Sequence, residues 1–173
     1  MSALGRLGLN GKTILITGGC SGIGAATARL AAARGARVMI ASPNPEKLTA
    51  VAKQITNAGG ICKWVACDIR DENQVQAMVS ATVREFGKLD AAYNNAGVSH
   101  GPVLTHEVPQ ELWERVMDVN VTGTYYCCRE ELKTFLAQGG GGVIIINGSM
   151  SGVTGVAHMT PYVASKHALA GMT

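Results

Sequence analysis

The sequence predicts an α/β protein with a doubly wound parallel sheet of about five strands in the order 3-2-1-4-5. Two observations carry this prediction. Short apolar runs rich in β-branched residues alternate with longer segments of helical composition, a pattern typical of a parallel sheet covered on both faces. A glycine-rich turn joins the first apolar run to the first helical segment, as in doubly wound nucleotide-binding folds.

The first half of the chain repeats a strand and a helix three times. The run TILIT predicts a buried strand, and the next segment ends at Gly35, a residue suited to cap a helix. Pro45 stands near the start of the second helix, and acidic residues open the third. We expect strands at 13–17, 36–41 and 62–68, and helices at 21–35, 44–60 and 71–87.

The second half continues the alternation. We expect a strand at 89–97, a long helical region from about 109 to 138 with a kink near Gly123, a strand at 143–148 and the beginning of another helix from 160. Right-handed crossovers between these strands give the doubly wound order. There is no linker and no internal repeat, so residues 1–173 form a single domain.

The composition argues against a nucleic-acid-binding, membrane-bound or secreted protein. The chain is 47% hydrophobic and 16% charged, with a net charge of +3 and no cluster of Lys or Arg, which points to no nucleic acid or membrane partner. Residues 1–12 lack the long apolar segment of a secretory signal. The five cysteines, at 20, 62, 67, 127 and 128, have no metal-ligand spacing. We therefore expect a cytoplasmic protein with reduced thiols and no metal site.

Two motifs suggest chemistry. In TGGCSGIG, at 17–24, glycines allow a tight turn before a helix whose N-terminus offers N–H groups to a phosphate. The spacing is G-x-x-x-G-x-G, and a purely structural turn is the alternative. Near the C-terminus, Tyr162 and Lys166 lie four residues apart and share a helix face. Alone, this pair could equally be an aromatic anchor beside a surface lysine.

Five motifs together resemble the single-domain branch of the short-chain dehydrogenase/reductase family, from residue 12 to the end. They are TGGCSGIG, NNAG at 94–97, Asn120 in MDVNVTG, Ser149 in INGSMSG, and YVASK. Ser149 precedes Tyr162 by 13 positions (162 − 149), the separation that the family shows. The resemblance implies an NAD(P)-dependent oxidoreductase that transfers a hydride between a nicotinamide cofactor and a hydroxyl or carbonyl group.

The resemblance also implies catalytic roles. Tyr162 would be the acid/base, and Lys166 would stabilise its phenolate and bind the nicotinamide ribose. Ser149 would orient the substrate oxygen, and Asn120 would hold a water of a proton relay. From the residues alone, Ser149 could instead cap local backbone, and Asn120 could be a polar residue satisfied by backbone.

The same resemblance assigns the cofactor-binding residues. Asp68 would bind the adenine amino group, although it could also cap the following helix. The segment Asn95–Gly97 would support the central strand and line the adenosine ribose. The full cofactor set is Gly18, Cys20, Ser21, Gly22, Ile23, Gly24, Ser42, Asp68, Ile69, Asn95, Ala96, Gly97, Tyr162 and Lys166.

Cofactor choice depends on the end of the second strand. Family members that use NAD usually carry an acid there, where this chain has Ser42. Members that prefer NADP often have a basic residue at the positions of Pro43 or Ser21, and neither is basic here. Since nothing at Ser42 repels a 2′-phosphate, NADP is slightly favoured over NAD.

The resemblance implies a small alcohol, ketone or aldehyde as substrate and a homo-oligomer, a dimer or a tetramer. It also implies that the 173 residues lack the family's C-terminal strands and substrate-covering segment, so that VIIING would be an exposed edge and this chain alone inactive. Two alternatives stay open at this point: a non-catalytic nucleotide-binding or interaction protein on the same fold, and a sugar epimerase or dehydratase.

Overall fold

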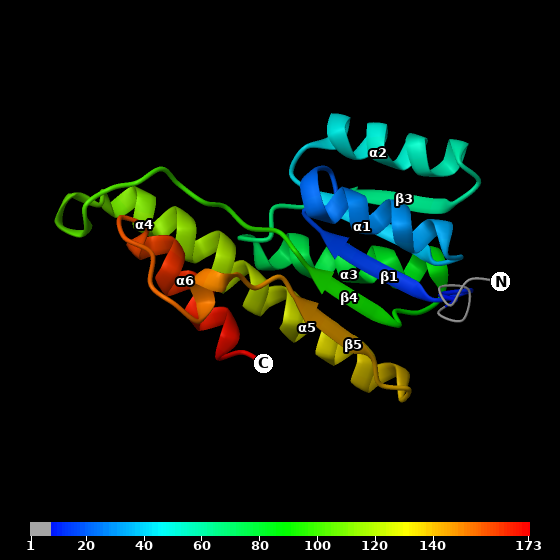
Figure 1. The fold of residues 1–173 in the computed structure, drawn as a ribbon. Helices are drawn as coiled ribbons and strands as arrows, with labels where there is room; N and C mark the ends of the chain where they lie inside the picture. Colours follow the sequence, from blue (N-terminus) through cyan, green and yellow to red (C-terminus); the bar gives the residue numbers. More distant parts are fainter. Residues whose placement is uncertain (1–7) are drawn as a thin grey trace.

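Five parallel strands form one sheet in the order β3-β2-β1-β4-β5 (Figure 1), which confirms the predicted fold class. The structure is a computed structural model and describes residues 8–173. Residues 1–7, part of the stretch without a secretory signal, lie outside the described residues. The strands are β1 (Thr13–Thr17), β2 (Arg37–Ser42), β3 (Ile61–Ala66), β4 (Ala91–Asn94) and β5 (Val143–Ile146).

Helices cover both faces of the sheet. On one face lie α1 (Gly22–Ala33) and α2 (Pro45–Asn57), and on the other lie α3 (Glu72–Phe86) and α5 (Thr124–Gln138). The remaining elements are α4 (Gln110–Met117), α6 (Thr160–Ala170) and the short turns η2 (Thr105–Glu107), η3 (Asp118–Gly123) and η4 (Met150–Gly152). No helix within residues 8–173 has both the length and the hydrophobicity that a bilayer span requires.

Two hydrophobic cores lie on opposite faces of the sheet because successive strand side chains alternate. Ile16 of β1 packs in a cluster with residues of α1 and α2, whereas its neighbour Leu15 packs in a cluster with residues of α3 and α5. Both are fully buried. The central strands are thus hydrophobic on both sides, which explains why their sequences are continuous apolar runs.

The predicted long helix is present, and its kink is a π-helical turn. The chain is helical from Gln110 to Gln138, and η3 at Asp118–Gly123 is the π-helical part between α4 and α5. A Cβ on Gly123 would lie 3.0 Å from the backbone oxygen of Ile69, so the helix can approach that loop only with glycine here. In Figure 1, α4 and α6 lie beyond the carboxyl ends of the strands.

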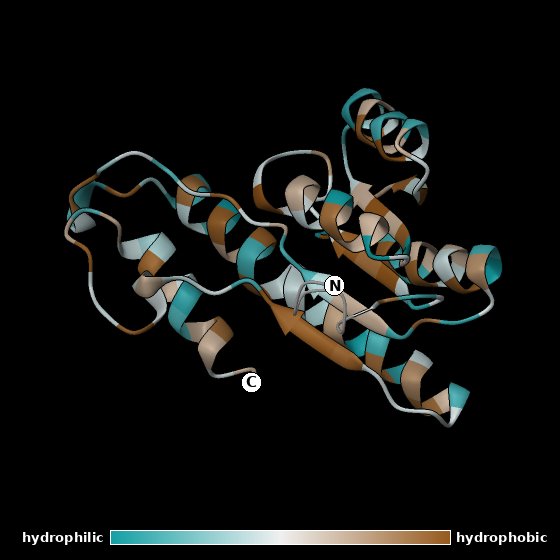
Figure 2. Ribbon diagram, turned by 45° about the vertical axis from the view of Figure 1, so that its right-hand side comes forward, coloured by the Kyte–Doolittle hydropathy of each residue, from teal (hydrophilic) through white to brown (hydrophobic). Residues whose placement is uncertain are grey.

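Strand β5 is an edge of the sheet and is covered on one face. Ile144 packs against the cluster formed with α3 and α5, while Val143 and Ile145, on the other face, are 56% and 54% exposed. Figure 2 shows β5 as a hydrophobic strand along the open side of the sheet. An apolar groove of about 500 Å³ runs between α1, β4 and β5. A hydrophobic edge of this kind favours pairing with other chains.

Candidate functional site

The glycine loop follows β1 directly and needs glycine at several positions. Gly18 and Gly22 have positive φ angles of 65° and 49°. A Cβ on Gly18 would lie 2.8 Å from Asn95 Nδ2, and one on Gly24 would collide with the backbone oxygen of Gly18. The loop can therefore pack this closely against the end of β4 only without side chains.

The N-terminus of α1 is available to an anionic ligand. Ser21 is the N-cap residue, but its side chain makes no capping hydrogen bond, and the first turn of α1 contains no acidic residue. Ser21 and Ile23 are exposed, and Cys20 is half-buried. Since the first N–H groups of a helix have no partner within it, this end of α1 suits a phosphate group.

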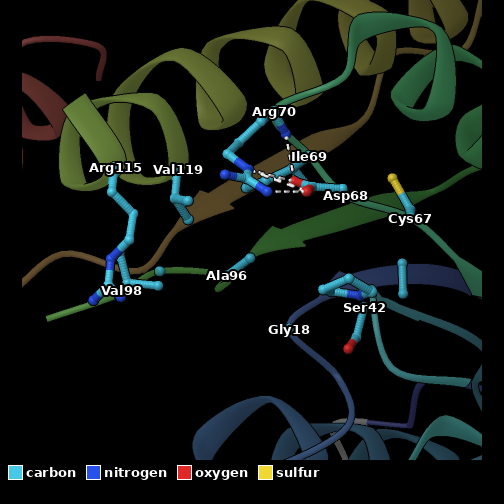
Figure 3. A pocket seen from close by; sticks show the side chains of 13 residues that line it. Gly18, Ser42, Cys67, Asp68, Ile69, Arg70, Ala96, Val98, Arg115 and Val119 are labelled. Carbon is cyan, nitrogen blue, oxygen red and sulfur yellow. Dashed lines mark hydrogen bonds and ion pairs between the residues drawn. The ribbon is translucent and has the colours of Figure 1, made fainter. Parts of the chain in front are cut away.

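A cavity of about 320 Å³ lies beside the loop, at the carboxyl ends of the strands (Figure 3). Six of the predicted cofactor residues line it: Gly18, Ser42, Asp68, Ile69, Ala96 and Gly97. The other seven lining residues are not in the predicted cofactor set, among them Arg70 and Arg115. Ser42 is buried at the end of β2, where its Oγ accepts a hydrogen bond from Asn44 N at 3.1 Å. The cavity therefore brings together most of the residues predicted to bind the adenosine half of a cofactor.

Asp68 is engaged by Arg70 and does not cap a helix. Arg70 Nη2 donates to Asp68 Oδ2 at 2.6 Å, and Arg70 Nε lies 3.0 Å from both carboxylate oxygens, as the dashed lines of Figure 3 show. This hydrogen bonding to Arg70 lowers the pKa of Asp68. The alternative of Asp68 as a helix cap is wrong, because Asp71 accepts from Asn73 N and Gln74 N at the start of α3. Only Asp71 directly precedes the first turn.

The end of β4 is tied to the end of β1 by hydrogen bonds. Thr17 Oγ1 accepts from the backbone N–H groups of Asn95 and Ala96, each at 3.1 Å. Asn95 Nδ2 in turn donates to the backbone oxygen of Thr17 at 3.1 Å. The NNAG segment is thus hydrogen-bonded to the residue at the start of the glycine loop.

On α6, Lys166 is buried beside Tyr162. Only 5% of Lys166 is exposed, and its Nζ lies 5.7 Å from the centroid of the Tyr162 ring. Lys166 Nζ donates to the backbone oxygen of Asn147 at 2.8 Å, and burial lowers the pKa of the lysine. Tyr162 itself is half-buried. This geometry is not that of an aromatic anchor beside a surface lysine, because a surface lysine keeps its ammonium in water.

Asn120 lies in the π-helical turn η3 and is fully buried. Its Nδ2 donates to Val98 O at 2.9 Å and to Ser165 Oγ at 3.0 Å, and its Oδ1 accepts from Val98 N at 2.8 Å. Both amide protons are therefore committed to protein partners. Asn120 joins three parts of the site: the segment after β4, the π-helical turn and α6.

Ser149 caps the short turn η4. Its Oγ accepts from Ser151 N at 3.1 Å, which is the local capping that the sequence left open. The bond uses the hydroxyl as an acceptor, so its own proton remains available to a substrate. Ser149 and Lys166 line one cavity of about 190 Å³, whereas Tyr162 lines neither this cavity nor the one beside the glycine loop.

Sequence reasoning missed two polar residues that connect the halves of the site. Asn147 accepts from Lys166 through its backbone oxygen, and its Nδ2 donates to Asn95 Oδ1 at 3.3 Å. Thr17 completes the path to the glycine loop. Both lie at or just beyond the carboxyl end of a parallel strand, which is the available sequence signal. No group of His, Cys, Asp or Glu side chains within residues 8–173 is arranged to hold a metal ion.

Comparisons with known proteins point to one family. A family model described as "short chain dehydrogenase" matches residues 12–173. The chain is 41% identical over 165 residues to 2,5-dichloro-2,5-cyclohexadiene-1,4-diol dehydrogenase from Sphingobium indicum; the match covers 95% of this chain and 65% of that protein. The chain thus spans less than two thirds of the length of this relative.

Two solved structures are similar over most of the chain. One is actinorhodin polyketide ketoreductase with NADPH, with a TM-score of 0.89 and 36% identity over 94% of this chain and 62% of that one. The other is NAD⁺-bound xylitol dehydrogenase, with a TM-score of 0.92 and 32% identity over 95% of this chain and 63% of that one. Together with the family model and the predicted motifs, these similarities lead to one conclusion. The chain belongs to the short-chain dehydrogenase family.

Proposed function

We propose that the protein is an NAD(P)-dependent oxidoreductase that interconverts a hydroxyl and a carbonyl group, with Tyr162 as its acid/base. The observation that carries the proposal is the buried ammonium of Lys166 beside the ring of Tyr162. Burying a lysine costs free energy, so its presence on this face of α6 calls for a role such as stabilising the phenolate.

The residues present fit a nicotinamide dinucleotide. The glycine loop packs against the end of β4 in a way that a Cβ at Gly18 or Gly24 would prevent, and the uncapped start of α1 suits the pyrophosphate. The 320 Å³ cavity, with Asp68 on its wall, suits the adenosine. When bound, the nicotinamide ring supplies or accepts the hydride.

The side chains of this chain handle the proton. In the reductive direction, Tyr162 gives its hydroxyl proton to the carbonyl oxygen, and in the oxidative direction it takes the proton from the alcohol. Lys166 stabilises the phenolate by its charge and also binds the nicotinamide ribose. Ser149 donates to the same substrate oxygen and orients it, and Asn120 takes part in a proton relay to solvent. Asn120 can do so through the remaining lone pair of Oδ1 or through its backbone oxygen.

Cofactor choice is proposed to favour NADP slightly. Ser42 carries no charge that would repel a 2′-phosphate, and it lines the cavity at the end of β2. Asp68 is already paired with Arg70, which reduces its repulsion of an anion. One similar solved structure contains NADPH and the other contains NAD⁺. They therefore support binding of a nicotinamide dinucleotide of either kind.

We further propose a small alcohol, ketone or aldehyde as substrate, a cytoplasmic location and a homo-oligomer. All five cysteines are free, which suits a reducing compartment. Exposed Leu132 and Leu136 on α5 offer apolar surface for a dimer or a tetramer. We also retain the expectation that residues 1–173 are one domain. Analytical ultracentrifugation of the complete protein tests the assembly.

The test of the activity is a direct assay of the complete protein. We expect oxidation of NADPH, and more weakly of NADH, with some member of a panel of ketones, aldehydes and keto-sugars. Calorimetric titration with each cofactor in the absence of substrate measures binding separately from turnover. Binding without turnover would favour a non-catalytic nucleotide-binding protein, and the absence of both would reject the proposed function.

A further inference from the structure

Two adjacent glutamates of α5 have opposite environments. Glu130 forms ion pairs with Lys133 and Arg129, and the hydrogen bond from Lys133 lowers the pKa of its carboxyl. Glu131 is fully buried and forms no ion pair among the described residues. Its hydrogen-bond donor is an amide: Asn94 Nδ2 donates to Glu131 Oε2 at 2.8 Å. An unpaired ionised carboxylate is costly at such a position.

The pair formed by Glu131 and Asn94 lacks a hydrogen-bond donor. Glu131 Oε1 and Asn94 Oδ1 are both buried and have no hydrogen-bond partner among residues 8–173. With Glu131 ionised, both are acceptors, so neither can satisfy the other. A proton on Glu131 Oε1 supplies the missing donor, and the acid and the amide can then close a ring of two hydrogen bonds. Burial raises the pKa of Glu131 to about 7, against the opposing effect of the bond from Asn94.

Among the described residues, no Lys, Arg or His side chain contributes to the pKa shift of this carboxyl. On α5 itself the neighbouring titratable groups are the thiols of Cys127 and Cys128. Burial raises the pKa of both thiols, and Glu131 adds to the rise. Strand β4 contributes the amide of Asn94, which also lies 3.5 Å from Cys128 Sγ. From α3, apolar side chains such as Val75 and Met78 join Cys127 in the core cluster. The strand β5 carries no titratable residue.

Asn94 lies two residues before Ala96, which lines the cofactor cavity. Asn94 is the last residue of β4, and the backbone N–H groups of the next two residues donate to Thr17 Oγ1. Ala96 and Gly97 line the 320 Å³ cavity. In Figure 1, α5 lies behind the sheet at β5, the neighbour of β4. The side chain of Asn94 is therefore anchored to α5, while its chain neighbours shape the ligand-binding turn.

We propose that Glu131 is a positioning residue of the cofactor site: as a neutral acid it pairs with Asn94 and holds the turn 95–97, and its ionisation releases that turn and weakens cofactor binding. The role in binding rests on the proposed function. The neutral acid–amide pair itself rests only on burial and hydrogen bonding.

The direction of the pH effect follows from the two protonation states. The unfolded chain ionises Glu131 near pH 4.5, whereas the folded protein keeps the proton until about pH 7. Between these values the folded state binds more protons, so Glu131 contributes less stability as pH rises, and the loss stops above about pH 7. A glutamine at this position cannot ionise and can form the same two hydrogen bonds.

The experiment compares the complete wild-type protein with Glu131→Gln and with Glu130→Gln as the matched control. NAD affinity and thermal midpoint are measured from about pH 5 to about pH 9. For wild type and Glu130→Gln, we expect the affinity for NAD to fall about fivefold across neutral pH. Glu131→Gln keeps the higher affinity throughout. The excess of its thermal midpoint over that of wild type should grow from about pH 5 to about pH 7 and stay constant above that, at about 5 °C or more.

A spectroscopic measurement on the wild type needs no stable variant. Infrared titration should show the carbonyl band of a protonated carboxyl that disappears near neutral pH. The absence of this band at pH 6 would overturn the neutral pair, and equal pH dependence of NAD affinity in wild type and Glu131→Gln would overturn the positioning role. If no variant bound NAD or NADP at any pH, the proposed function would fail together with the positioning role, while the band and the thermal profile would still decide on the pair.

Discussion

The glycine loop packs closely against the end of β4 because it lacks side chains, whereas α6 brings two polar side chains to its part of the site. Around the loop, a Cβ at Gly18 or Gly24 would meet protein atoms, so shape sets what can bind. On α6, Lys166 is held by a hydrogen bond to Asn147 and lies over the Tyr162 ring, so charge and proton position set what can react. The difference indicates that substitutions around the glycine loop mainly alter cofactor affinity, and that substitutions on α6 alter turnover.

The largest expected effect comes from Tyr162→Phe. The ring and its packing remain, but the proton donor is lost, so turnover should fall about 10³-fold while cofactor affinity stays nearly unchanged. Steady-state kinetics and calorimetry on the complete protein measure the two quantities. Tyr125→Phe, on the exposed side of α5, is the control and should retain activity. Turnover within a few-fold of wild type in Tyr162→Phe would reject the acid/base role.

Lys166→Met should reduce turnover less than Tyr162→Phe does, but it should also weaken cofactor binding. The substitution keeps the apolar length of the buried side chain and removes its charge and its bond to Asn147. Turnover should fall about 10²-fold and the cofactor dissociation constant should rise several-fold, because the ammonium serves both steps. Lys133→Met makes the same substitution at an exposed lysine and serves as the control. A change in only one of the two parameters would separate the roles that we assign to Lys166.

On the glycine-loop side, Ser42→Asp should change cofactor choice without changing the chemistry. A carboxylate at the end of β2 can accept from a ribose 2′-hydroxyl and repels a 2′-phosphate, so preference should shift toward NAD by about tenfold. Dissociation constants for NAD and NADP give the ratio. Ser42→Ala removes the hydroxyl without adding charge and should leave the ratio unchanged. An unchanged ratio in Ser42→Asp would show that this position does not contact the ribose.

The smallest expected effect is that of Ile145→Lys, in the edge strand β5, on stability. Ile145→Lys changes a side chain that is more than half exposed, so the free energy of unfolding should change by less than about 0.5 kcal/mol. Self-association of the 173-residue chain should decrease, because lysine on an edge strand opposes pairing. Ile144→Lys, one residue away but facing α3 and α5, should destabilise by about 2 kcal/mol or more. Chemical denaturation and sedimentation velocity distinguish the two. Equal destabilisation would contradict the observed burial of β5.

Local patterns predicted the sheet, but the connections within the site depend on distant residues. The run TILIT corresponds residue for residue to β1, because alternation and length are local properties. The predicted strand 89–97 is only Ala91–Asn94, since Asp90 binds Thr13 N and the segment after Asn94 turns toward Thr17. Asn147 and Glu131 were missed as functional candidates, because their partners lie 19 and 37 residues away in the chain.

The π-helical turn determines how the protein tolerates the insertion or deletion of a residue. A π-helical turn contains one residue more than the α-helical turn that it replaces, so α4 and α5 differ in angular phase although the chain is helical throughout. Deleting a single residue within Asp118–Gly123 would restore the α-helical repeat and rotate α4 by about 100° relative to α5. Asn120 could then no longer reach Val98 and Ser165 from its present position. An insertion or deletion of one residue here is therefore far more disruptive than most point substitutions in the same segment.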